Sequence, residues 1–391
     1  MSKQFLLFLM LIFSTTCNQA SSSSTSKALN EFSVDLFREI FNSNENIIIS
    51  PYSIRLALTM LYGSATGKTK IAMKNALKFD ENIFKFASQF SREMKMFNEI
   101  RSNENIKIAN KIFTNSALRL NEKFAKRLEN VFDTKIRAIN TRDKKLIAEE
   151  TNRWAANVTD NMIDKIMSPE DVPNDLEALL LSAIALQANW LNKFSVIATK
   201  TANFYGSENS IGNVQMMSQT NYFPYGKSDE LDAEFIELPY ERDSDLAMWI
   251  LLPSVDSNLK KLLSKFNLNA LKNVRSNARN TRINLQIPKF EFKYEITANN
   301  ALENLGLKSI FDEGEFQIYT NRASSINSIK QNAYVKVDEQ GTRAAAITSI
   351  IVTTRMVLPA IPVVANRPFM FMILKASTQE LLFIGSYVNS S

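Results

Sequence analysis

Apolar residues recur at helical spacing through the first part of the chain, and this pattern predicts a series of amphipathic helices. The stretch 54–61 is apolar on most of its faces, which predicts a deeply buried helix. A short apolar strand at 47–50 should precede it, stopped by Pro51, with Ser50 in position to cap the helix. Helices are expected over 29–41, 54–61, 69–77, 83–100, 121–131 and 144–157.

Strand-like runs dominate the second part of the chain. The run 179–190 is almost wholly apolar, which predicts a central strand covered on both faces. Further strands are expected over 234–238, 246–252, 281–287, 289–292, 333–337, 369–374 and 381–387, with helices at 259–266 and 296–305. Helices first and strands later predict an α+β fold with large mixed sheets. We find no internal repeat and no linker past residue 26, so residues 21–391 are expected to form a single domain.

The first twenty residues predict a secretory signal peptide. Lys3 precedes the apolar run 5–13, which is too short to span a bilayer, and small and polar residues lead to Ala20. Cleavage is expected after Ala20, with Cys17 as the alternative, and a membrane anchor is the competing interpretation of the run. The Ser/Thr run 21–26 is expected to be a flexible mature terminus. A secreted, extracellular protein that does not bind a membrane is the prediction.

Composition removes most catalytic chemistry. The chain has no histidine, and its one cysteine, Cys17, leaves with the signal peptide. Ser-His and Cys-His pairs, His-ligated zinc and thiolate metal sites are therefore excluded from the mature chain. We find no glycine-rich phosphate loop among the nine glycines. We expect neither an enzyme nor a metal or cofactor site, and an enzyme stays the weakest alternative.

Charge and sequons suggest surface properties. Basic residues gather in two groups, Lys123, Lys126 and Arg127, and Lys272, Arg275, Arg279 and Arg282. Such groups can bind polyanions such as glycosaminoglycans weakly, or they are simply solvated helix faces. Nucleic acid is not an expected partner of a secreted protein, and a monomer is expected. Glycosylation sequons begin at Asn157 and Asn389.

One segment near the C-terminus combines strand composition with an exposed arginine. Residues 344–354 carry no charge, glycine or proline, and most are small or β-branched. Arg355 and Met356 follow, and then two prolines within four residues predict an extended loop. One face of the segment begins with Thr342, Ala344, Ala346 and Thr348, all small enough to slip between packed strands. An ordinary core strand that ends at an arginine is the alternative on this pattern alone.

The segment 337–348, Val-Asp-Glu-Gln-Gly-Thr-Arg-Ala-Ala-Ala-Ile-Thr, resembles the hinge of the reactive-centre loop in inhibitory serpins. Other motifs of that family recur in the family's order and cover nearly the whole mature chain. They are 46–51 with 53–58, 152–154 with Thr159 and Ile163, 186–194, 214–217, 237–240, 287–290, 305–306, 367–369 and 383–385.

The resemblance implies a serpin fold with an exposed reactive-centre loop at about 339–362, and a secreted suicide inhibitor of trypsin-like serine proteases. The bait residue falls fourteen positions after Gly341, at Arg355, so the reactive bond would be Arg355–Met356. A guanidinium suits a pocket with a carboxylate at its floor. The implied hinge residues are Glu339, Gly341, Thr342, Ala344, Ala345, Ala346 and Thr348.

Some positions depart from the family pattern. Arg343 replaces a usual acidic residue, and Gln331 and Asn366 stand where histidine or aspartate is common. The segment from Arg355 to Arg367 is about two residues longer than usual. Cleavage after Met356 or Leu358 therefore stays open for other proteases. A non-inhibitory serpin, acting as a carrier or storage protein, is the main alternative function.

Overall fold

Helices dominate the N-terminal part of the chain and strands the remainder, as the apolar pattern predicts. The computed structural model describes residues 19–103, 105–140, 143–312, 314–320, 322–341 and 359–390. The α-helices there are α2 (Gln19–Ile40), α3 (Pro51–Tyr62), α4 (Gly67–Ala76), α5 (Ile83–Ser102), α6 (Glu122–Phe132), α7 (Lys144–Val158), α8 (Leu259–Lys265), α9 (Leu268–Asn277) and α10 (Asn299–Leu302). The strands are β1 (Ile47–Ile49), β2 (Ile106–Asn115), β3 (Arg137–Ile139), β4 (Ala178–Leu186), β5 (Lys200–Tyr205), β6 (Ile211–Ser228), β7 (Ala233–Pro239), β8 (Leu246–Pro253), β9 (Arg279–Pro288), β10 (Phe290–Thr297), β11 (Ser328–Val337), β12 (Ile361–Val364), β13 (Phe369–Lys375) and β14 (Leu381–Tyr387).

The start of α3 follows the predicted chemistry. The Ser50 hydroxyl accepts a hydrogen bond from the Ser53 N–H at 3.1 Å, and Pro51 occupies the first helical turn. Nearly every residue of α3 is buried, so the predicted deep helix is confirmed. The helices expected at 69–77, 83–100, 121–131 and 144–157 are also present, with bounds within two residues.

The Ser/Thr run at the N-terminus differs from its prediction. Residues 21–26 lie inside α2, which begins at Gln19, so the flexible-terminus interpretation is wrong for this structure. The buried residues Leu29, Phe32 and Phe37 fix the later turns of α2. Extending an existing helix costs little free energy, so residues 21–26 can continue it toward the N-terminus. Cleavage after Ala20 would fall just inside α2, and residues 1–18 lie outside the described residues.

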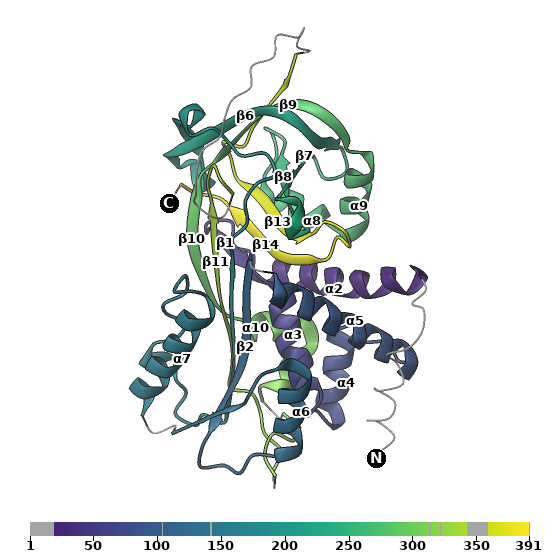
Figure 1. The fold of residues 1–391 in the computed structure, drawn as a ribbon, viewed down its shortest axis with the longest axis vertical. Coiled ribbons are helices and arrows are strands. Elements are labelled where there is room, and N and C mark those ends of the chain that lie inside the picture. The colour runs from purple at the N-terminus through teal and green to yellow at the C-terminus, as the bar shows by residue number, and fades with distance from the viewer. Residues whose placement is uncertain are drawn as a thin grey trace.

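Five strands form a sheet in the order β10-β11-β4-β2-β3, with β11 and β4 parallel. In Figure 1, α7 covers one face of this sheet, and α3 and α6 lie on the other. All nine residues of β4 are buried, which confirms the central strand. The prediction of 179–190 was four residues too long, because the Gln187 N–H leaves the ladder and donates to the Asn105 carbonyl at 2.6 Å.

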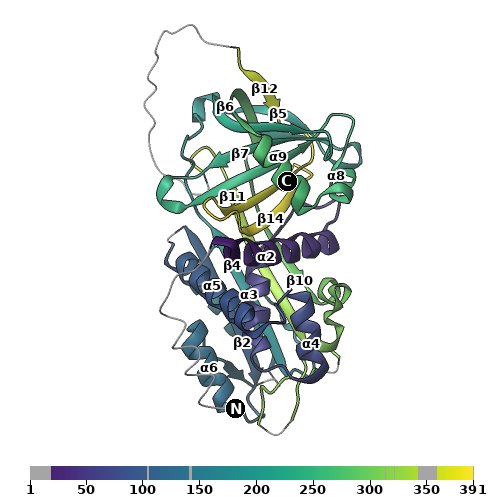
Figure 2. The same ribbon diagram turned by 90° about the vertical axis from the view of Figure 1, so that its right-hand side faces the viewer.

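The second sheet forms the other half of the molecule (Figure 2). Its order is β1-β14-β13-β8-β7-β6-β9-β12, with β5 paired to β6. The strand β12 pairs in parallel with β9, from Ile361↔Ile283 to Val364↔Gln286. The chain between β11 and β12 therefore connects the two sheets.

The main errors of the sequence prediction concern strands. The strands β2 and β6 were missed, because their exposed and buried positions do not alternate regularly. The helix expected at 296–305 starts later, because β10 continues to Thr297 and α10 begins at Asn299.

Candidate functional site

The predicted hinge begins in a tight turn at the end of β11. The Asp338 N–H donates to the Gly341 carbonyl at 2.8 Å, and the Gly341 N–H donates back at 3.2 Å. Gly341 has φ +135°, and a Cβ there would lie 2.2 Å from the Ala188 carbonyl oxygen. Only glycine meets both demands without strain. Glu339 and Gly341 are described, whereas Thr342, Ala344, Ala345, Ala346, Thr348, Arg355 and Met356 lie outside the described residues.

The carboxylate of Glu339 anchors this turn. Glu339 is only 5% exposed, and its carboxylate accepts a hydrogen bond from the Thr199 hydroxyl at 2.6 Å and pairs with the Lys289 ammonium at 2.8 Å. Burial by itself would raise the pKa of Glu339, but the bonds from Lys289 and Thr199 hold that pKa below its ordinary value. Glu339 is therefore a charged tether between β11, the start of β10 and the loop before β5.

Two stacked aromatic residues, Trp190 and Tyr240, lie on the inner side of the same turn. The Trp190 indole N–H donates to the Asp338 carbonyl at 3.0 Å, and its backbone N–H donates to the Gln340 carbonyl at 2.8 Å. The Trp190 ring stacks on Tyr240 with centroids 4.5 Å apart and planes 13° apart. The backbone of the turn is thereby fixed on its inner side.

The boundary between β4 and β11, here called the seam, leads directly to this turn. The parallel ladder runs from Ser328↔Leu179 to Tyr334↔Ala185 and ends there, although β11 continues to Val337. The two sides meet again at the bridge between Asn189 and Gly341. The last residues of β11, 335–337, are thus paired with β10 on one side, while the ladder with β4 ends at Tyr334.

Gln331 lies at the middle of the seam and is fully buried. Its amide accepts from the Ser50 N–H at 2.8 Å and donates to the Ser50 carbonyl at 3.0 Å and to the Ser182 hydroxyl at 3.2 Å. The Ser182 hydroxyl in turn lies 2.8 Å from that of Ser53 on α3. This cluster joins both strands of the seam to the helix behind them through neutral groups.

The two sequons differ in their surroundings. Asn157 is exposed on the last turn of α7, while the Thr159 hydroxyl is buried and bonded to the Ala155 carbonyl. Asn389 instead donates from its side-chain nitrogen to the Asn44 carbonyl at 3.0 Å. Its side-chain oxygen accepts from the N–H and hydroxyl of Ser207 and from the Ser210 hydroxyl. Only Asn157 presents an uncommitted amide.

The two basic groups also differ. Lys123 and Lys126 lie exposed on α6 beside Arg127, which donates to the Gly63 carbonyl. In the second group, Arg275 is half-buried and paired with Glu237 at 2.6 Å. Lys272 and Arg279 of the second group are exposed, so both basic groups present cations to solvent.

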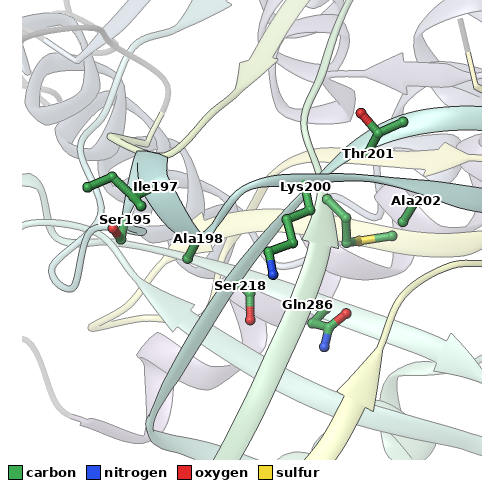
Figure 3. Close-up of a pocket in the computed structure, with 9 residues that line it drawn as sticks. Ser195, Ile197, Ala198, Lys200, Thr201, Ala202, Ser218 and Gln286 are labelled. Carbon is green, nitrogen blue, oxygen red and sulfur yellow. The ribbon is translucent and has the colours of Figure 1, made fainter.

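A shallow groove of about 600 Å³ lies near the hinge (Figure 3). In this view the Lys200 side chain points toward Ser218 and Gln286, and Ile197 lies at the opposite side. The residues that line the groove are Ser195, Ile197, Ala198, Lys200, Thr201, Ala202, Met216, Ser218 and Gln286. They provide one cation and neutral polar groups, and none of them is a carboxylate.

Within the described residues, no helix is both long and apolar enough for a membrane span. No cluster of three or more acidic, cysteine or histidine side chains with the geometry of a metal site occurs there.

Sequence reasoning missed several residues of the hinge. Lys289 and Thr199 were not assigned, although Lys289 lies within a motif that the family shares. Nothing in the local sequence pairs Thr199 with a residue 140 positions away.

Comparisons with known proteins agree with the geometry. Among curated proteins, the chain is similar to "Intracellular coagulation inhibitor 2" of Tachypleus tridentatus, with 29% identity over 92% of this chain and 89% of that one. It is similar to "Leukocyte elastase inhibitor" of Sus scrofa, with 29% identity over 92% of this chain and 98% of that one. Among solved structures, "Crystal structure of native protease nexin-1 with heparin" matches with a TM-score of 0.84 and 26% identity, covering 94% of this chain and 100% of that one. The family model described as "Serpin (serine protease inhibitor)" matches residues 27–390, and the chain therefore belongs to the serpin family.

Proposed function

We propose that this serpin is a suicide inhibitor of trypsin-like serine proteases, with Arg355–Met356 as its reactive bond. The protease serine attacks the carbonyl of Arg355, releases the amine of Met356 and is left as an acyl-enzyme. The freed segment then enters the seam as an added strand and pulls the protease away. A strand from Thr342 to Arg355 spans roughly 45–50 Å at ~3.3 Å per residue.

The observation that carries the proposal is the arrangement at the top of the seam. The parallel ladder ends at Tyr334↔Ala185, and the chain leaves β11 at Gly341 directly beside that end. A strand that continues from Gly341 would start at the boundary between β4 and β11. The small residues Thr342, Ala344 and Ala346 support entry, because a bulky or charged group would be costly there.

The test is incubation of the purified protein with trypsin, a thrombin-like protease and an elastase-like protease. We expect a covalent complex with trypsin on a denaturing gel, and a released C-terminal fragment whose mass begins at Met356. Arg355→Ala should lose complex formation with trypsin because it removes the pocket-filling cation. Undiminished complex formation by that variant, or a fragment that begins elsewhere, would contradict the assignment of the reactive bond.

We also propose weak glycosaminoglycan binding at the exposed cations of α6. The related protease nexin-1 structure was solved with heparin, and Lys123 and Lys126 are exposed here. Heparin forms one arm of the same assay, and it should speed complex formation only modestly because the patch is small.

We propose that the protein is secreted and carries a glycan at Asn157 alone. Lys3 and the apolar run 5–13 support secretion, and the uncommitted amide of Asn157 supports modification there. Expressed in a secretory eukaryotic cell, the protein should appear in the medium with a mass that falls after glycosidase treatment. Asn157→Gln should remove that mass difference and Asn389→Gln should keep it. A protein retained in the cytosol, or a glycan that Asn389→Gln removes, would contradict this proposal.

A further inference from the structure

The segment that follows α7, residues 159–172, lies over the seam on the outer face of the five-stranded sheet. Its apolar side chains Ile163, Ile166 and Met167 share one buried cluster with Leu181 and Ala183 of β4. In Figure 1 it joins the end of α7 to the sheet, on the face opposite α3. We call residues 159–172 the crossing segment.

Polar contacts attach the crossing segment to the β11 side of the seam. The Asn332 amide donates to the Lys165 carbonyl at 2.7 Å, and the Lys330 ammonium pairs with Asp171 at 3.1 Å. On the edge strand β10, Lys293 forms an ion pair with Asp164. Side chains alternate along β11, so Lys330 and Asn332 face the crossing segment, whereas Gln331 faces α3.

Other contacts attach the same segment to the β4 side. The Lys107 ammonium on β2 pairs with Asp160 at 3.2 Å. Just past the end of β4, the Gln187 amide donates to the Met162 sulfur at 2.9 Å. The crossing segment is therefore bonded to strands on both sides of the seam.

The environment of these ion pairs favours the charged forms of their side chains. Lys330 is only 4% exposed, and a second carboxylate, Glu295 of β10, lies 3.5 Å from its ammonium. Burial alone would raise the pKa of Asp171, but bonds from Ser168 and Lys330 lower it below its ordinary value. The pKa of Asp164 is lowered chiefly by its bond from Lys293. Asp164 and Asp171 are therefore charged at neutral pH.

Opening the seam breaks this arrangement. An added strand separates β4 from β11 by about one further strand spacing, ~4.8 Å. Hydrogen bonds and ion pairs that now measure 2.7–3.2 Å on both sides cannot all persist after such a displacement. Either the contacts to β10 and β11 or those to β2 and β4 must be released.

We infer that the crossing segment is an electrostatic clasp across the seam that slows strand insertion and is loosened by salt. The inference rests on the proposed function, because it assumes that the seam accepts a strand. Screening weakens the exposed pairs Lys293–Asp164 and Lys107–Asp160 first. The rate of strand insertion should therefore rise with ionic strength.

The test measures uptake of a strand without any protease. A synthetic, fluorescently labelled peptide with the sequence of residues 342–354 is incubated with the intact full-length protein, and its incorporation is followed by size-exclusion chromatography. Asp164→Asn and Asp160→Asn each remove one ion pair, on opposite sides of the seam, and both keep the shape of the side chain. Each should speed uptake by about two- to five-fold at low salt. Both differences should shrink at high salt, as wild-type uptake accelerates.

The matched control is Glu291→Gln, which removes the ion pair to Lys336 at 3.2 Å. That pair is about as exposed as Lys293–Asp164, at 36% and 52% against 42% and 71%, and lies on the same sheet face. It joins β10 to β11, which stay together when the seam opens, so uptake should match wild type.

The outcomes separate the clasp from the proposed function. Equal uptake rates in all four proteins, or acceleration by Asp164→Asn alone, would overturn the clasp and leave the inhibitor assignment standing. No uptake by any of the proteins would overturn the proposed function, and the clasp with it. A thermal melt of each variant checks that the exposed substitutions leave the fold intact.

Discussion

At the scale of single residues, the hinge depends on the charge of Glu339. Its carboxylate is buried yet held by Lys289 and Thr199, so its charged form is favoured in the folded protein. A carboxyl whose folded pKa is depressed stabilises the fold above its unfolded pKa of ~4.3 and loses that contribution as pH falls through the folded pKa. The chain has no histidine, so no side chain of ordinary pKa adds a transition between pH 5 and 8.

Glu339→Gln should therefore lower the free energy of unfolding by about 1–3 kcal/mol at pH 7, because a buried charged hydrogen-bond pair is lost. The deficit relative to wild type should shrink as pH falls below ~4.3, the ordinary pKa of a glutamate, because the stabilisation from the depressed pKa is lost progressively toward the folded pKa. Denaturant melts at pH 7 and pH 3.5 measure it. Glu241→Gln is the control, since Glu241 is exposed and pairs with Lys193 at the long distance of 3.8 Å, so the substitution should cost under about 1 kcal/mol. A constant deficit at both pH values would refute the charge argument.

At the scale of elements, local sequence patterns predicted most helices. They predicted few of the contacts between elements. Apolar periodicity placed α5 and α7 closely, and the structure shows that Asn82 and Asp143 cap them through local side-chain bonds. The strand β6 was missed because its pairing with β9, not its own pattern, keeps it extended.

The sequence likewise identified only part of the candidate site. Glu339 and Gly341 could be assigned as hinge residues from the family motif, but the partners of Glu339 could not. The contacts of the crossing segment were equally hidden, because Asp164 and Lys293 are 129 positions apart. Such long-range pairs are set by the packing of α7 on the sheet, which no local pattern encodes.

At the scale of the whole molecule, the two sheets are linked by the chain between β11 and β12, which contains the proposed bait residue Arg355. Its start is fixed at Gly341 beside the seam, and its end is fixed in β12 on the other sheet. While both ends are tethered, residues 342–355 cannot all enter the seam. Under the proposed mechanism, a cut at Arg355 would remove one tether and allow a new strand to pair with β4 and β11, which would add backbone hydrogen bonds and bury β-branched side chains.

The most direct test is the melting temperature of the protein before and after a single cut in residues 342–358, with the cut site verified by mass. The added strand should raise the melting temperature by roughly 10 °C or more, because the extra ladder stabilises the central sheet. A cut protein that melts within about 2 °C of the intact one would show that no strand is gained. That result would contradict the inhibitor mechanism and favour a carrier or storage role.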